Sequence, residues 1–219
     1  MDQARTMPSQ TSSARPGNRR AQQKAATREV ILKAARELFE EKGFEPTTIR
    51  AVAARAGVGL GTVMSHFPDK EALLTAALLD DWNAFMAQGL ADMPPGLDWR
   101  GMLLHLCGTF YDYYARRPAL SRALLRAMLM NPRLWNGGDL TGKETEAMDL
   151  AAAVLAQAQA SGEIRAEVDC HEAAAALMAL YQFALFEGLT RSEVRASDMR
   201  DRLESLSLLV LRGLAPAEK

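Results

Sequence analysis

The stretch from residue 47 to 68 constrains this chain most, because its pattern fits two short helices joined by a tight turn. Apolar residues at helical spacing lead to Gly57, and glycine readily takes the left-handed conformation that ends a helix. A second short helix is predicted from about Gly59 to His66, where Pro68 then breaks the pattern. Two short helices joined in this way form a helix-turn-helix.

The second helix of this pair is predicted to turn one side outward. Val58, Val63 and Phe67 have the spacing that anchors it to a core. The residues left nearer the outside are Leu60, Gly61, Thr62, Met64, Ser65 and His66. A helix held in this way can place its exposed face in the major groove of DNA, which is about 12 Å wide.

The segment before this pair predicts one longer helix and an arm. Apolar residues recur at helical spacing from Val30 to Phe39, with Thr27 placed as an N-cap and Gly43 just past the end. Residues 1–24 are rich in Ser, Gln, Pro and Arg and nearly free of large apolar side chains, which is typical of disorder. We therefore predict a disordered basic arm over residues 1–24 and a three-helix domain over residues 25–70.

Residues 71–219 carry further helical patterns. A long helix begins at Asp69, and later helices are expected at about 97–115, 118–130, 142–161, 170–188 and 196–213. No sustained alternation of apolar and polar residues predicts a strand. The 219 residues are 48% hydrophobic, which is enough to bury a core. The predicted fold class is all-α, with about nine helices in an N-terminal helix-turn-helix domain and a larger helical domain.

The formal net charge of −1 hides a division of charge along the chain. Residues 1–70 hold 12 Lys and Arg against 7 Asp and Glu, a net charge of +5, which leaves −6 for residues 71–219. A basic front part followed by an acidic part suggests a polyanionic partner for the front part alone.

The sequence offers little support for a cofactor, a metal or catalysis. The run from Gly57 to Gly61 lacks the third glycine and the preceding strand of a dinucleotide-binding loop, so no cofactor is expected. Cys107 and Cys170 lie far apart, and their neighbouring histidines do not complete a zinc-ligand spacing, so neither a disulfide nor a metal site is expected. No motif of a known catalytic set appears, so the protein is not expected to be an enzyme.

The apolar segments of the sequence suggest neither export nor a membrane-spanning helix. The N-terminus has no apolar stretch ahead of a cleavage site. The longest apolar run, residues 173–186, is too short to span a bilayer. We therefore expect a cytoplasmic protein.

Residues 27–71 resemble the DNA-binding domain of the tetracycline-repressor (TetR) family of transcriptional regulators. The motifs that carry the resemblance are Gly43-Phe44, Thr47-Thr48, Ala56-Gly57-Val58, Gly61-Thr62, His66-Phe67 and Lys70-Glu71. They cover about a fifth of the chain, and beyond them only the number and lengths of the helices agree. The resemblance implies a homodimer that binds specific double-stranded DNA, with a helical regulatory and dimerisation domain over residues 71–219 that takes a small-molecule effector.

The resemblance also implies which residues contact DNA. These are Thr47, Thr48, Arg50, Leu60, Gly61, Thr62, Met64, Ser65, His66 and Lys70. Thr47 and Thr48 would hold a phosphate at a helix N-terminus, and Lys70 would pair with another. Met64 stands where the family commonly has Tyr, and Leu60 where a polar residue is frequent, so apolar contact with thymine methyl groups is expected there.

Aromatic residues in the larger domain fit two interpretations. Such a cluster at helical spacing is often plain core, but in this family the regulatory helices surround a cavity for small, largely apolar ligands. The residues predicted to line such a cavity are Trp82, Phe85, Phe110, Tyr111, Tyr114 and Met128. Asp112 and Glu187 are the carboxylates that would meet a cationic ligand, or else they face solvent.

The last two predicted helices are apolar on more than one side. A terminal helix of this kind needs one face for its own domain and another for something else. Pairing both helices with their copies gives an intermolecular four-helix bundle, which the resemblance also implies. The residues predicted at this dimer interface are Leu177, Tyr181, Ala184, Leu203, Leu206 and Val210. The alternative is that one chain covers both faces.

Two functions fit these observations. The first is a repressor that is released from a near-palindromic operator by a small apolar ligand. The second is an architectural or partner-bridging DNA-binding protein without an effector. The roughly 150 residues after residue 70 exceed what dimerisation requires, which favours the first function. A closed cavity in the larger domain distinguishes the two.

Overall fold

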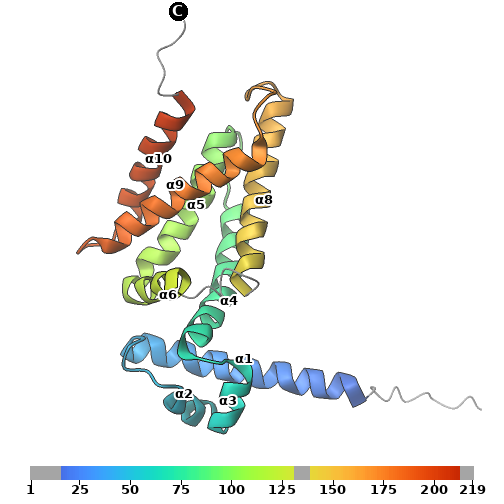
Figure 1. Ribbon diagram of the computed structural model, residues 1–219, viewed down its shortest axis with the longest axis vertical. Helices are drawn as coiled ribbons and strands as arrows, with labels where there is room; N and C mark the ends of the chain where they lie inside the picture. Colours follow the sequence, from blue (N-terminus) through green and yellow to red (C-terminus); the bar gives the residue numbers. More distant parts are fainter. Residues whose placement is uncertain (1–15, 131–138, 213–219) are drawn as a thin grey trace, which may run out of the picture.

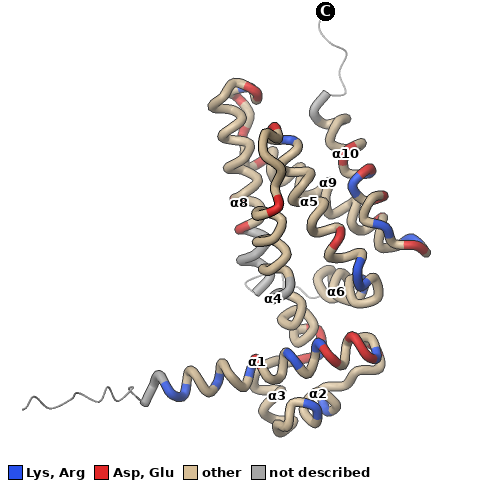
Figure 2. The backbone as a smooth tube through the Cα atoms, turned by 180° about the vertical axis from the view of Figure 1, so that it is seen from behind, with Lys and Arg blue, Asp and Glu red and all other residues tan. Residues whose placement is uncertain are grey.

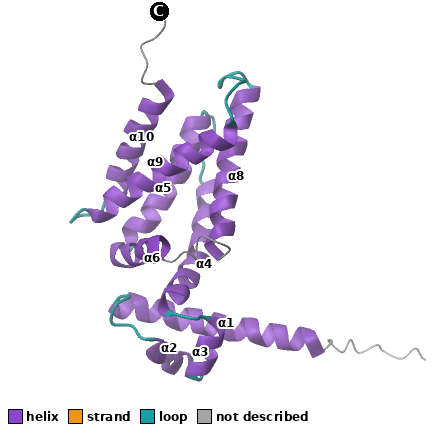
Figure 3. Ribbon diagram, viewed as in Figure 1, coloured by secondary structure: helices purple, strands orange, loops and turns teal. Residues whose placement is uncertain are grey.

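A computed structural model describes residues 16–130 and 139–212 of the protein, and no strand occurs among them (Figure 3). The helices of this part are α1 (Pro16–Lys42), α2 (Ile49–Ala56), α3 (Leu60–His66), α4 (Lys70–Ala91), α5 (Trp99–Arg116), α6 (Pro118–Met130), α8 (Asp139–Ala160), α9 (Cys170–Thr190) and α10 (Ala196–Arg212). The predicted all-α fold class is confirmed.

The helices form two units that are connected by one long helix (Figure 1). Helices α1, α2 and α3 make a small unit at one end of the molecule, and α5, α6, α8, α9 and α10 make a larger bundle above it. Helix α4 runs from the small unit into the bundle and packs against both α1 and α5. The polypeptide therefore connects the two units through a continuous helix.

Helix α1 begins earlier than its apolar pattern predicted. It starts at Pro16, so residues 16–24 are helical and the prediction of a disordered arm over them is wrong. The Thr27 hydroxyl donates to the Gln23 carbonyl within the helix, so Thr27 is not its N-cap. Residues 19–26 are all exposed, which explains why no apolar stripe marks them. A helix already held by packing can extend through good helix formers such as Arg, Ala, Gln and Lys. Residues 1–15, the remainder of the predicted arm, lie outside the described residues.

Polar residues fix where several helices begin. Thr48 caps α2 by accepting a hydrogen bond from the Ala51 N–H, and Asp69 caps α4 in the same way at Ala72. Asp98 and Asp169 cap α5 and α9. Each of these side chains satisfies a backbone donor that the helix cannot pair internally. Gly57 ends α2 in the left-handed conformation, with φ of 67°.

The small unit has a closed apolar core to which α4 contributes. Ile31, Leu32 and Ala35 of α1 are fully buried, as are Val52 of α2 and Val63 of α3. Leu73, Leu74 and Ala77 of α4 complete the same core and are also fully buried. The first two turns of α4 therefore belong to the helix-turn-helix unit as much as to the bundle.

Helix α9 is long and apolar enough to cross a membrane, judged by length and composition alone. The core helix of a folded domain meets the same criterion, and α9 lies in the bundle between α8 and α10. Its residues Tyr181, Ala184, Leu185 and Leu189 are buried in the bundle. The fold therefore gives α9 a packing role that explains much of its apolar composition.

The contact between α9 and α10 depends on a missing side chain. We predict that Gly188→Ala lowers the free energy of unfolding by about 1–3 kcal/mol, because the added methyl group overlaps the buried side chain of Met199. Gly61→Ala is the control, since no heavy atom outside its own helix lies within 4 Å of the added carbon. Denaturant unfolding followed by circular dichroism measures both variants. Equal stability of the two variants would contradict the close packing at Gly188.

Candidate DNA-binding surface and ligand cavity

Helix α3 presents its predicted outer face to solvent. Leu60 and Met64 are 41% and 45% exposed, whereas Val63 is fully buried against the core. Gly61 lies in open space, so the backbone of α3 can be approached closely at that point. Ser65 is exposed and donates its hydroxyl hydrogen bond to the Thr62 carbonyl. Thr62 and His66 are half-buried at the edge of the same face.

The two threonines before α2 have different roles. Thr48 and the nearby Arg50 are exposed at the N-terminus of α2, as a phosphate contact requires. Thr47 is only 2% exposed, and its hydroxyl donates to the Gly43 carbonyl at 2.7 Å and to the Leu38 carbonyl at 3.3 Å. The prediction that the Thr47 hydroxyl holds a phosphate is therefore wrong. Its side chain ties the start of α2 to the end of α1, through carbonyls four and nine residues earlier in the chain.

Lys70 lies where α4 starts and is already engaged within the protein. Its ammonium group donates to the carbonyls of Phe44 and Glu45 at 3.0 and 3.1 Å and stands 4.1 Å from the centre of the Phe44 ring. An ammonium group has three donors, so one remains for a phosphate. Lys70 thus joins the loop before α2 to the first turn of α4.

Arg55 of α2 contacts two glutamates of α1. The sequence alone did not predict this contact. The Arg55 guanidinium group makes two hydrogen bonds to Glu41, at 2.8 and 2.9 Å, and a third to Glu37 at 3.2 Å. The hydrogen bond from Arg55 lowers the pKa of the Glu41 carboxyl. The partners are 14 and 18 residues apart in sequence, so no local spacing rule reveals the pair. A bidentate pair of this kind fixes the angle of α2.

A cavity of about 360 Å³ lies inside the larger bundle and is lined mainly by apolar side chains. Its wall is built by α4, α5, α6, α8, α9 and α10. Four of the residues predicted to line it do so: Trp82, Phe110, Tyr114 and Met128. Trp82 and Phe110 meet edge to face, with ring centres 5.4 Å apart. Cys107 also lines the cavity, and burial raises the pKa of its thiol to about 12, so the thiol stays protonated.

Two predicted lining residues lie outside the cavity. Tyr111 is fully buried, stacks on Tyr181 and donates its hydroxyl to the Tyr181 carbonyl at 3.0 Å. Phe85 packs edge-on against Tyr113 and lies under the Arg116 guanidinium group. Helices α4 and α5 each turn only part of their aromatic side chains toward the cavity.

The two carboxylates considered for a cationic ligand are engaged elsewhere. Asp112 pairs with Arg200 of α10. Glu187 pairs with Arg191 and Arg202, whose hydrogen bonds lower the pKa of the Glu187 carboxyl. Neither lines the cavity. Both join neighbouring elements of the bundle.

The predicted dimer seam is mostly an internal surface. Leu177, Tyr181 and Leu203 line the cavity, and Ala184 is fully buried within the chain. The assignments of Tyr181, Ala184 and Leu203 to an interface are wrong, because these three side chains are buried within the chain, whereas Leu177 is half-buried. Leu206 is half-buried and Val210 is 54% exposed, so these two remain available. The large apolar side chains that α9 and α10 expose are Phe183, Phe186, Leu209 and Val210.

A family comparison identifies the helix-turn-helix unit. Residues 31–77 match the family described as bacterial regulatory proteins, tetR family. The helix-turn-helix unit of the chain belongs to this family. The matched range ends at Ala77, so it includes the turns of α4 that complete the small core. With this unit, the chain is a helix-turn-helix transcriptional regulator and not an enzyme.

Relatives of the chain extend the likeness beyond the matched unit. The transcriptional regulator UidR of Escherichia coli is 27% identical over 144 residues, 65% of this chain and 71% of its own. The transcriptional repressor NicS of Pseudomonas putida is 28% identical over 203 residues, 89% of this chain and 95% of its own. The crystal structure of Thermus thermophilus FadR, a TetR-family repressor in complex with lauroyl-CoA, has a TM-score of 0.71 at 24% identity and covers 88% of this chain and 97% of its own. That last likeness concerns the fold.

We predict that Gly61→Ala weakens DNA binding about tenfold or more while leaving the fold intact, because a methyl group on the exposed face of α3 keeps the backbone from approaching DNA. Gln157→Ala, on the exposed side of α8, is the matched control and keeps wild-type affinity. Fluorescence anisotropy with a DNA site selected from a random pool measures both variants. Unchanged affinity of Gly61→Ala would remove α3 from the closest part of the interface.

Proposed function

We propose that this protein is a homodimeric, cytoplasmic repressor that leaves its near-palindromic operator when a small apolar molecule fills the cavity of the larger bundle. The observation that carries the proposal is the placement of α4. Its first turns lie in the core of the helix-turn-helix unit, and Trp82 and Met86 near its other end line the cavity. At 22 residues, α4 is about 33 Å long and touches both sites.

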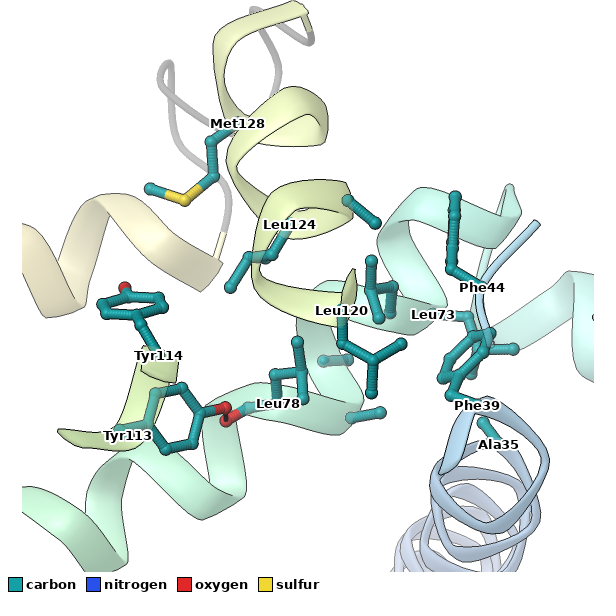
Figure 4. Packing of buried hydrophobic residues seen from close by; sticks show 14 of the residues in the cluster. Ala35, Phe39, Phe44, Leu73, Leu78, Tyr113, Tyr114, Leu120, Leu124 and Met128 are labelled. Carbon is teal, nitrogen blue, oxygen red and sulfur yellow. Dashed lines mark hydrogen bonds between the residues drawn. The ribbon is translucent and has the colours of Figure 1, made fainter. Parts of the chain in front are cut away.

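An unbroken run of buried side chains supports this coupling (Figure 4). It leads from Phe39 of α1 through Leu73 of α4 and Leu120 of α6 to Tyr114 and Met128 at the cavity wall. Close-packed interiors transmit displacements because their side chains have no room to absorb them. A ligand that moves the wall near Tyr114 or Met128 therefore displaces α4, together with the helix-turn-helix unit packed on its first turns, relative to the rest of the bundle.

Charged contacts give a second connection between the units. Arg117 of the α5–α6 turn lies 2.8 Å from Glu40 of α1, and Arg126 of α6 lies 3.1 Å from Glu45 of the loop before α2. The Arg36 guanidinium group donates to the Ala77 carbonyl of α4 at 3.3 Å. These contacts favour one orientation of the bundle relative to the helix-turn-helix unit, and ligand entry would shift that orientation.

The proposed DNA surface consists of α3, the start of α2 and the projecting half of α1. The contact residues are Thr48, Arg50, Leu60, Gly61, Thr62, Met64, Ser65, His66 and Lys70. Figure 2 shows Lys and Arg spread along the projecting half of α1, where Arg19, Arg20 and Lys24 are exposed and no acidic residue occurs. Basic side chains in this position displace counterions from the phosphate backbone, so the affinity should depend strongly on salt.

The proposed effector is small and largely apolar, as the cavity lining suggests. The similar fold of Thermus thermophilus FadR, which was solved in complex with lauroyl-CoA, supports a regulator of this fold that binds a ligand. A purely architectural DNA-binding protein does not require a cavity of this kind. The repressor with an effector is therefore the better supported function.

The proposed dimer interface follows the exposed stripe of α9 and the outer side of α10. Ala176, Ala179, Phe183 and Phe186 are exposed at intervals of three and four residues, as in a helix-packing seam. Leu209 and Val210 of α10 add two side chains that are each 54% exposed. Exposed apolar groups of this number on adjacent helices favour a second copy of the chain as their partner.

We predict that Phe183→Asp combined with Phe186→Asp makes the protein monomeric and abolishes tight operator binding, because unpaired carboxylates would be buried between the copies. Leu129→Asp is the matched control, since Leu129 is 57% exposed on α6, outside the proposed seam. Light scattering after size exclusion gives the mass, and anisotropy gives the DNA affinity. A double variant that stays dimeric would place the interface elsewhere.

We predict that an effector and the operator weaken each other's binding by the same factor, with a coupling free energy of about 1–3 kcal/mol. Trp82 and Trp99 line the cavity and report its filling through their emission. A candidate apolar compound is titrated into free protein and into protein saturated with operator DNA. Equal affinity in both titrations would exclude release from DNA by that compound.

A further inference from the structure

Two tyrosines give the apolar cavity a polar end. Tyr114 of α5 and Tyr181 of α9 both line the cavity, beside Met128 of α6. The Tyr114 side chain lies close enough to Tyr181 to contribute to its raised pKa, although the residues are 67 positions apart in sequence. Tyr114 is 8% and Tyr181 9% exposed, so both side chains are largely shielded from water.

Two of the three charged residues of the wall, Asp98 and Arg100, lie away from this pair. Asp98 and Arg100 line the cavity at the first turn of α5. Arg100 precedes Tyr114 by 14 residues, which is about 21 Å along a helix and beyond the reach of an arginine side chain. The third charged wall residue, Glu204 of α10, is exposed to solvent. Gln182, which follows Tyr181, adds an uncharged amide to the wall.

The tyrosine pair stays uncharged and favours an uncharged ligand group. Burial raises the pKa of Tyr181 well above its ordinary value, so its hydroxyl is protonated at physiological pH. A carboxylate placed beside the pair would lose its hydration without gaining a cation. A neutral hydroxyl or carbonyl group would instead exchange hydrogen bonds with phenols that can rotate, donate and accept.

We infer that the cavity selects an elongated apolar molecule whose inner end carries an uncharged oxygen group, hydroxyl or carbonyl, held by Tyr114 and Tyr181. The face of α5 that lines the cavity runs from Arg100 to Tyr114, so the cavity follows most of that helix and suits a chain or a narrow ring system. This inference rests on the proposed function for the use of the cavity, and it adds the chemistry of the ligand.

Three ten-carbon probes test the inference at pH 7.5: 1-decanol, decane and decanoate. Their affinities for the full-length protein are measured without DNA through tryptophan emission. We expect 1-decanol to bind about fivefold or more tightly than either other probe, which is the size of a net hydrogen-bond contribution. In Tyr114→Phe combined with Tyr181→Phe, the preference for 1-decanol over decane should disappear while decane affinity is kept, which also shows that the cavity is intact.

Tyr111→Phe is the matched control. Tyr111 stacks on Tyr181, but it does not line the cavity and its hydroxyl is bound to the Tyr181 carbonyl, so this variant should keep the preference. The inference is overturned if decanoate binds as well as 1-decanol, if none of the probes binds, or if the double variant keeps the preference. Operator release is measured separately by anisotropy. A preference that depends on the tyrosines without release of DNA would leave the inference standing and remove the proposed function.

Discussion

The packing of α4 against α1 is the interaction on which the rest of the structure depends. Leu73, Leu74 and Ala77 enter the core formed by α1, α2 and α3, where they have no exposed surface. Burying a leucine stabilises the fold by about 1.5–3 kcal/mol, so removing these turns of α4 from the core would cost several kcal/mol. The orientation of the helix-turn-helix unit is therefore set by α4, and the orientation of α4 is set by the bundle.

The polar contacts around this core orient the units and add little stability. The ion pairs from Arg117 and Arg126 are substantially exposed, and pairs of that kind contribute about 0–1 kcal/mol. The buried hydrogen bond from the Tyr113 hydroxyl to the Leu78 carbonyl adds a fixed contact between α5 and α4. Weak orienting contacts beside a strong apolar core allow two orientations to be close in free energy, as a switch requires.

Local chemistry explains which features could be predicted. The cap residues Thr48 and Asp69 and the left-handed Gly57 act on backbone groups within a few residues, so the sequence displays them directly. The outward face of α3 was equally visible, because Val63 and Phe67 mark the opposite side. The early start of α1 was missed because residues 19–26 touch nothing that would require an apolar side chain.

By itself, the sequence determined that the chain is helical, where most helices end, and that α3 turns a mixed polar and apolar face outward. Only the tertiary structure decided that Thr47 faces inward, that Phe85 and Tyr111 miss the cavity, and that Tyr181 and Leu203 line the cavity instead of a dimer seam. The physical reason is that helical periodicity gives the angle of a side chain around its own helix. Which element packs against that side of the helix depends on contacts between segments far apart in the chain.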